Sequence, residues 1–107
     1  MTELILVQTT IDSKEKADEL AEKMTTAGYS ACTQIEGPIT SFYKWKGNIE
    51  QDQEWRCTFK TSELLYPEFE KALKQNHSYE TPEIIILPIV GGSDDYLKWF
   101  RNELKKE

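Results

Sequence analysis

The segment ITSFYKWKGNIEQDQEWRCTFKT, residues 39–61, decides the fold that this sequence predicts. It holds two runs rich in β-branched and aromatic residues, separated by Lys46-Gly47-Asn48. Such runs around a glycine are typical of a long β-hairpin. Gly47 and Asn48 are expected to form a two-residue turn. A three-residue turn is the alternative, and it would exchange the two faces of the hairpin.

The two faces of this predicted hairpin differ in chemistry because side chains alternate along a strand. One face carries apolar side chains, and the other sets an aromatic row beside a carboxylate row. The apolar face contains Phe42, Trp55, Cys57 and Phe59. On the other face, Ser41, Tyr43 and Trp45 are expected opposite Glu54, Asp52 and Glu50, in that order.

Strand and helix patterns flank the hairpin. Apolar runs at residues 4–11 and 83–90 predict strands buried on both faces, and residues 29–35 predict a strand that bulges at Glu36-Gly37-Pro38. Helical periodicity predicts three helices, at residues 13–27, 63–76 and 94–104. Their expected N-caps are Asp12, Ser62 and Ser93.

This order of elements is the split βαβ, or ferredoxin-like, pattern of an α+β fold. It predicts one antiparallel sheet with two helices on one face and an added C-terminal helix. The length of 107 residues favours a single domain over 1–107. Because the helices cover one face while the hairpin has aromatics on both, we expect self-association. Partial shielding of the hairpin within a monomer is the alternative.

Composition narrows the function. Nineteen acidic and thirteen basic residues give a net charge of −6, which is opposite to the footprint of a nucleic-acid-binding protein. No apolar run approaches the roughly 18 residues of a membrane span, and the first residues lack a secretory leader, so a cytoplasmic location is expected. Phosphate-loop, dinucleotide, protease and hydrolase motifs are absent from the sequence. We therefore expect no catalytic residues and no enzyme activity.

Thiol, imidazole and carboxylate side chains in this sequence are candidate metal ligands. Cys32 is either a small buried residue or a soft ligand for copper. His77 is either a residue favoured by a helix end, or a ligand or proton-transfer group. A closed four-ligand site would need carboxylates, methionine or another subunit as well. Glu50, Asp52 and Glu54 form either a solvated edge or a weak site for hard cations.

Five short segments in this order resemble the CutA family of divalent-cation tolerance proteins. The likeness runs from about Glu3 to Leu104. The segments are Ala31-Cys32, residues 41–49 (SFYKWKGNI), Glu54 with Lys60-Thr61, residues 77–85 (HSYETPEII) and residues 96–99 (YLKW). The resemblance implies a cytoplasmic homotrimer similar in architecture to PII signalling proteins and associated with divalent cations, with Cu(II) foremost and no organic cofactor.

The resemblance also implies site residues. Cys32 and His77 correspond to the metal-ligand candidates of the family. The residues expected to line or brace clefts between subunits are Tyr43, Trp45, Glu54, Lys60, Tyr79, Glu83 and Trp99. The leading hypothesis is a trimer that binds divalent metal ions and contributes to cation tolerance. The alternatives are a PII-like sensor of a small anionic metabolite, bound through Lys60 and His77, and a structural trimer that scaffolds a partner.

Overall fold

The structure is a computed structural model that describes residues 3–106; Met1, Thr2 and Glu107, the ends of the predicted domain, lie outside the described residues. The strands are β1 (Leu4–Ile11), β2 (Cys32–Trp45), β3 (Asn48–Ser62) and β4 (Ile85–Pro88). The helices are α1 (Lys14–Thr26), α2 (Tyr66–Asn76) and α3 (Asp94–Glu103). The predicted α+β class and order of elements are confirmed.

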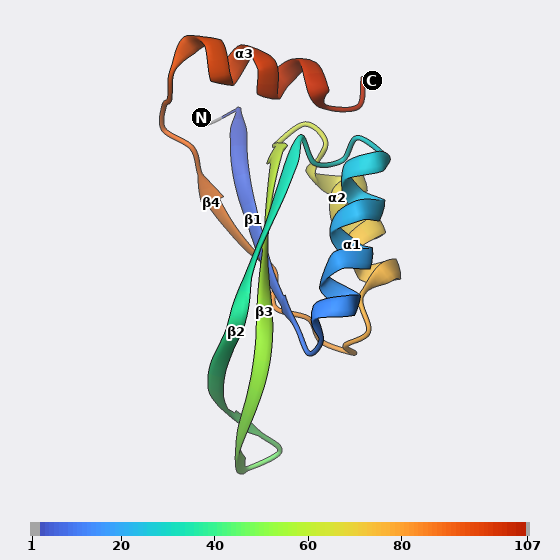
Figure 1. Cartoon of the computed structure of the whole chain (residues 1–107), viewed down its shortest axis with the longest axis vertical. Coiled ribbons are helices and arrows are strands. Elements are labelled where there is room, and N and C mark those ends of the chain that lie inside the picture. Colours follow the sequence, from blue (N-terminus) through green and yellow to red (C-terminus); the bar gives the residue numbers. More distant parts are fainter. Residues whose placement is uncertain (1–2, 107) are drawn as a thin grey trace.

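The four strands form one sheet in the order β2-β3-β1-β4, and every neighbouring pair is antiparallel. Since β3 lies between β1 and β2, the two strands joined through α1, the connection is a split βαβ unit. Figure 1 shows α1 and α2 together on one side of the sheet, with α3 across the end where β1 begins. This arrangement confirms the two helices on one face and the additional C-terminal helix.

The main core lies between the sheet and helices α1 and α2. Phe59 of β3 meets Phe69 of α2 edge to face, with ring centroids 5.2 Å apart. The apolar stripe of α1 packs there as predicted, with Ala17, Leu20 and Met24 buried. A second cluster joins α3 to the sheet end through Phe100, Leu104 and Leu4. These contacts fix the half of the hairpin that lies nearest the helices.

The hairpin of β2 and β3 has two unlike halves. Residues 55–62 of β3 pair with β1, and residues 56–60 of this stretch also pair with β2, whereas residues 48–54 pair with β2 alone among the described strands. We call residues 39–54 the distal hairpin and residues 32–36 with 55–62 the proximal hairpin. Figure 1 shows the distal hairpin projecting beyond the rest of the molecule. The whole molecule is therefore elongated, with extents of 45, 25 and 22 Å.

The predicted register of the hairpin was wrong by two residues. The turn is Lys46-Gly47, with φ of 52° and 83°, so Trp45 pairs with Asn48 and Tyr43 with Glu50. A tight hairpin turn needs two residues with positive φ, and here Lys46 adopts the first of these positions. Because the shift is two residues and the side-chain period is two, the predicted faces are unchanged.

A bulge interrupts β2 between Glu36 and Ile39, as predicted, and the Gly37–Pro38 peptide there is cis. Because of the extra residue, even-numbered β2 residues pair with even-numbered β3 residues before the bulge, and odd-numbered β2 residues do so after it. Cys32 and Glu36 share the face of even-numbered β3 residues, but beyond the bulge this face belongs to Tyr43 and Trp45. A Cβ on Gly37 would lie 2.5 Å from a ring carbon of Trp55. Glycine is thus required for this close approach.

Two N-cap predictions were wrong. The N-cap of α1 is Ser13, whose hydroxyl accepts the Lys16 N–H at 3.0 Å, while Asp12 instead pairs with the Lys16 ammonium at 3.3 Å. Ser62 ends β3, and its hydroxyl caps the following turn by accepting the Leu65 N–H at 3.2 Å. The N-cap of α2 is Leu65, which makes no side-chain cap bond, because the turn at 63–65 separates Ser62 from the helix. Ser93 caps α3 as predicted.

Strand β4 is shorter and more exposed than predicted. Only Ile85–Pro88 of the expected run 83–90 form a strand, and all four residues are exposed in the single chain. β4 lies at the edge of the sheet, where it pairs with β1 over four residues. The apolar run therefore does not mark a strand buried on both faces within one subunit, and it leaves apolar surface at an edge.

Candidate functional site

A cleft of about 800 Å³ lies between the distal hairpin and the segment that follows α2. Five carboxylates line it, and its described lining contains no lysine or arginine. The carboxylates are Asp12, Asp52, Glu54, Glu80 and Glu83. The aromatic side chains in the lining are Phe42, Tyr43, Trp45 and Tyr79. The structure thus brings together five of the seven predicted ligand-binding residues, namely Tyr43, Trp45, Glu54, Tyr79 and Glu83.

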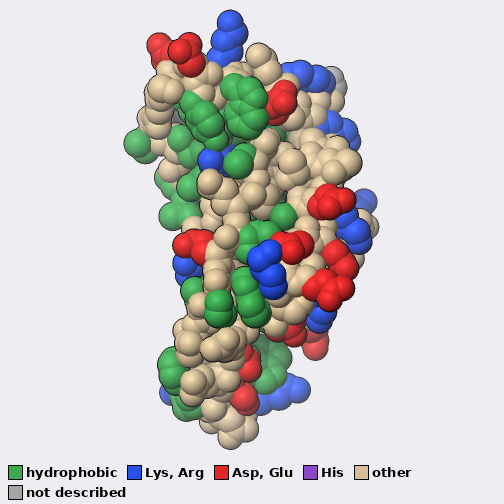
Figure 2. Space-filling model, in the orientation of Figure 1, with side chains coloured by type: hydrophobic (Ala, Val, Ile, Leu, Met, Phe, Trp, Pro, Cys, Tyr) green, Lys and Arg blue, Asp and Glu red, His purple; other side chains and the backbone are tan. Residues whose placement is uncertain are grey.

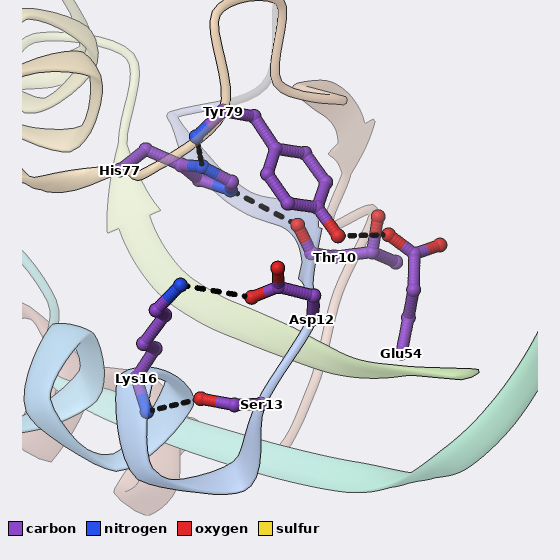
Figure 3. A network of polar contacts seen from close by, with 7 residues as sticks. All are labelled: Thr10, Asp12, Ser13, Lys16, Glu54, His77 and Tyr79. Carbon is purple, nitrogen blue, oxygen red and sulfur yellow. Dashed lines mark hydrogen bonds and ion pairs between the residues drawn. The ribbon is translucent and has the colours of Figure 1, made fainter. Parts of the chain in front are cut away.

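Glu54 is the most deeply placed carboxylate of this cleft, with 7% of its surface exposed. The Tyr79 hydroxyl donates to one of its oxygens at 2.7 Å. Figure 3 shows this oxygen directed at Tyr79 and the other directed away. Burial, followed by the bond to Glu54, raises the pKa of Tyr79, so this phenol remains a neutral donor.

His77 follows α2 as its C-cap and is buried against the end of β1. Its Nδ1 accepts the Tyr79 N–H at 3.1 Å, so the proton lies on Nε2, which donates to the Thr10 carbonyl at 2.9 Å (Figure 3). Burial lowers the pKa of His77, although the Thr10 carbonyl opposes this effect. The imidazole is therefore neutral, and its contacts place Tyr79 beside Glu54.

A second phenol and carboxylate meet at the outer wall of the cleft. The Tyr43 hydroxyl donates to Asp52, which lies diagonally across the hairpin. This bond, with smaller contributions from desolvation and nearby carboxylates, raises the pKa of Tyr43 to about 12. Both wall tyrosines therefore remain uncharged, and the negative charge of the cleft resides on the carboxylates.

The two predicted metal ligands lie apart within one chain. Cys32 pairs with Lys60, which pairs with Leu6, whereas His77 contacts Thr10, four residues farther along β1. Four residues of strand span about 13 Å, while a metal ion holds its ligands at about 2.0–2.3 Å. Cys32 and His77 of one subunit cannot share an ion in this arrangement. Within residues 3–106, no three side chains of His, Cys, Asp or Glu group as a metal site.

Lys60 and Trp99 lie outside the cleft. Lys60 donates to the Tyr96 hydroxyl at 2.7 Å, and the Tyr96 and Trp99 rings stand 5.5 Å apart. Lys60 is six residues from Glu54 on β3, which corresponds to about 20 Å. The predicted set of seven thus divides between the acidic cleft and a separate basic and aromatic cluster near α3.

Two acidic residues of the cleft were missed by the sequence prediction. Asp12 was expected to act as a helix cap, and Glu80 was quoted within the segment 77–85 without a role. The signal for Asp12 is its position after β1, beside the strand that carries Glu54. No signal of comparable strength singles out Glu80, because its position depends on the irregular path of the chain after His77.

A model of the CutA1 divalent ion tolerance protein family matches residues 5–103. The chain belongs to this family. The match covers the sheet, the three helices and every residue of the cleft lining. It confirms the CutA resemblance drawn from the sequence.

Curated CutA proteins from bacteria and plants are similar over nearly all of this chain. It is 36% identical over 101 residues to the divalent-cation tolerance protein CutA of Thermus thermophilus, covering 94% of this chain and 96% of that protein. It is also 36% identical over 101 residues to the chloroplastic CutA protein of Arabidopsis thaliana, with the same coverage of this chain. This chain spans only 56% of the length of the Arabidopsis protein. The name of the Thermus thermophilus protein describes a tolerance protein and not an enzyme.

Solved CutA1 structures share the fold closely. The CutA1 structure from Oryza sativa superposes with a TM-score of 0.95 at 35% identity, covering 99% of this chain and 97% of that one. The structure of the divalent cation tolerance protein from Thermus thermophilus gives 0.92 at 33% identity, with coverage of 95% and 99%. The antiparallel sheet, the three helices and the long hairpin are therefore the CutA1 fold.

Exposed hydrophobic side chains gather in two regions of the surface. Figure 2 shows hydrophobic side chains gathered over β4 and α3, and again over the distal hairpin beside acidic groups. The exposed apolar residues include Phe42, Ile49, Ile86, Val90 and Trp99. No helix of residues 3–106 is long and apolar enough to cross a membrane.

Proposed function

We propose that this CutA protein is a cytoplasmic homotrimer, one domain per chain over residues 1–107, that binds divalent metal ions, copper foremost, and contributes to tolerance of such ions. The observation that carries the proposal is the acidic cleft, with five carboxylates and no basic residue in its described lining. Carboxylate oxygens attract divalent cations. The family is described as one of divalent ion tolerance.

The trimer is supported by what one chain leaves uncovered. Phe42 and Ile49 are 68% and 66% exposed on the distal hairpin, and Val90 beyond β4 is 95% exposed. Large exposed apolar groups on strands and sheet edges mark sites of association. The surfaces that assembly would cover are the face of the distal hairpin that carries Phe42 and Ile49, and β4 of neighbouring copies.

Cys32 and His77 remain our candidates for copper ligands, each completed by groups from another subunit. Cys32 is partly exposed, and thiolate sulfur suits copper. In the single chain, both ring nitrogens of His77 have protein partners. One nitrogen would have to give up its hydrogen bond before His77 could bind a metal ion. We therefore expect Cys32 to contribute more to copper binding than His77.

Titration calorimetry with Cu(II) tests the metal site. Cys32→Ala should weaken binding by at least about tenfold, and His77→Ala by less. Glu19→Gln, which removes an exposed carboxylate of α1 that does not line the cleft, is the charge control and should bind as the wild type does. Equal binding by the wild type, Cys32→Ala and His77→Ala would remove both residues from the site. No binding of Cu(II), Zn(II) or Mn(II) would overturn the metal proposal.

The alternative of an anionic metabolite has less support. Lys60 lies outside the acidic cleft, and His77 is neutral and buried. A cleft lined by five carboxylates repels an anion rather than binding it. The scaffold alternative would be favoured if neither cations nor small metabolites changed the melting temperature of the protein.

A further inference from the structure

Glu54 is a buried carboxylate without a cation beside it. It is only 7% exposed and lines the cleft, and its side chain has one described partner, the neutral Tyr79 hydroxyl. Among residues 3–106, no lysine, arginine or histidine forms an ion pair with it. Burying a carboxylate is costly unless a positive charge or a full set of hydrogen bonds compensates it. The second oxygen of Glu54, directed away from Tyr79, is open to a positively charged ligand in the cleft.

The cleft has room for a ligand much larger than a bare metal ion. Its volume of about 800 Å³ lies within the range of about 300–1,000 Å³ found for sites of small organic molecules. Its carboxylates are spread along the walls, so that among residues 3–106 no three of them lie close enough together to hold one ion. Separated negative charges in a roomy cleft fit a cation whose positive charges are themselves separated.

The walls are suited to an organic cation. Tyr43 and Trp45 share the hairpin face that carries Asp52 and Glu54, and both rings are about half exposed. Aromatic faces attract ammonium groups, and their apolar surface covers methylene chains. A bare metal ion would gain little from these rings, whereas an alkylammonium would contact both kinds of wall.

The spacing of the carboxylates matches a particular class of cation. Asp52 and Glu54 lie two residues apart on one face of β3, so their side chains emerge about 7 Å from each other. Three or four methylene groups hold two ammonium groups at a comparable separation. A linear chain of this kind could place one charge at each carboxylate and its methylenes over the rings.

We infer that the acidic cleft binds a linear aliphatic polyamine, with one ammonium at Glu54 beside Tyr79, the next at Asp52, and the methylenes against Tyr43 and Trp45. This inference extends the proposed binding of cations, and it shares with that proposal only the acidic cleft. It assigns to the cleft an organic ligand class, separate from the copper ligands Cys32 and His77.

Titration calorimetry of the full chain with spermidine and putrescine tests the assignment. Spermidine should bind saturably, with one molecule per chain, and butylamine, which has a single ammonium, should bind at least about tenfold more weakly. Glu54→Gln keeps an acceptor for the Tyr79 hydroxyl and should weaken the binding of spermidine by about tenfold or more. Trp45→Leu, at an exposed position, should weaken it severalfold without affecting folding.

The control is Glu19→Gln, which removes the same negative charge but lies on exposed α1. It should bind spermidine as the wild type does. Equal losses in Glu54→Gln and Glu19→Gln would mean diffuse attraction to an acidic protein and would overturn the site. Absence of spermidine binding at millimolar concentration would overturn it too.

The same titrations separate this inference from the proposed function. Binding of Cu(II) without binding of spermidine would leave the metal proposal in place and refute the polyamine site. Binding of spermidine that Glu54→Gln weakens and Cys32→Ala does not would support the polyamine site even if no divalent metal bound.

Discussion

The proximal and distal halves of the β2–β3 hairpin are built from similar residues and have opposite environments. In the proximal half, Cys57 and Phe59 are fully buried beneath α1 and α2. In the distal half, Phe42 and Ile49 are about two-thirds exposed. The difference comes from β1, which ends opposite Trp55 and leaves the rest of the ribbon two-stranded. One half thus anchors the fold, and the other presents the aromatic and acidic groups of the cleft.

The contrast has an energetic side. A two-stranded ribbon in water is marginally stable by itself, whereas a third strand and a helix layer make a sheet stable. The distal hairpin therefore needs further contacts to keep its shape, and neighbouring copies of the chain are our proposed source. Substitutions in the two halves should report on different properties, namely unfolding for the proximal half and assembly for the distal half.

The largest effect should come from the proximal half. Phe59→Ala removes a fully buried ring packed on Phe69 and should lower the free energy of unfolding by about 3–5 kcal/mol. Urea unfolding followed by circular dichroism measures the loss. Phe42→Ala is the matched change in the distal half and, at a protein concentration at which the chain is monomeric, should cost less than about 1 kcal/mol. Equal losses would contradict the difference between the halves seen in the single chain.

Assembly should respond to charge placed on the distal half. Phe42→Asp combined with Ile49→Asp should convert a species of about three chain masses into a folded monomer of 12.5 kDa. The reason is that buried, unpaired carboxylates disfavour an apolar contact. Sedimentation velocity measures the mass, and circular dichroism checks the helices. Leu64→Asp, at a 73% exposed position outside the hairpin, should leave assembly unchanged. A monomeric wild type would refute the trimer.

A smaller effect should separate the two phenol–carboxylate pairs. Tyr79→Phe removes the donor to buried Glu54 and should cost about 1.5–3 kcal/mol of unfolding free energy, the range for hydrogen bonds to charged groups. Tyr43→Phe removes the bond to exposed Asp52 and should change the unfolding free energy much less, because solvent screens that contact. Urea unfolding of both variants at pH 7.5 gives the comparison. A larger loss for Tyr43→Phe would show that the outer pair is the more buried one in the assembled protein.

The smallest effect concerns pH. Burial lowers the folded-state pKa of His77 below its unfolded value near 6.5, so the unfolded chain binds the proton more readily. The stability due to neutral His77 is complete above about pH 6.5 and is lost as pH falls toward the folded-state value. The slope should not exceed about 1.4 kcal/mol per pH unit. Urea unfolding between pH 5 and 7.5, with chelator present, should show this slope in the wild type and a reduced one in His77→Gln.

Periodicity allowed much of the fold to be predicted. The apolar run 4–11 became β1, the stripe of Ala17, Leu20 and Met24 became the buried face of α1, and the run 39–61 became most of the hairpin. Burial enforces such patterns, so they are visible in one sequence. The exposed β4 shows the limit of this approach, because an apolar run does not reveal whether its cover comes from its own chain or from another.

The site was predicted less completely because it depends on distance rather than on pattern. Tyr43, Trp45 and Glu54 could be grouped because strand alternation places them on one face. The separation of Lys60 from this group followed only once β3 was seen to run continuously for 15 residues. The turn at Lys46-Gly47 was missed because asparagine tolerates positive φ better than lysine does, so composition favoured Gly47-Asn48.

The bulge between Glu36 and Ile39 acts as a phase shift in the ribbon. A β2 strand that lost this one residue would form a regular ladder, with Cys32 still opposite Lys60 and Ile39 still opposite Glu54, so Tyr43 and Trp45 would stay on the acidic face. A single deletion at the bulge should therefore remove the local bend of the ribbon and leave the alternation of the cleft wall intact.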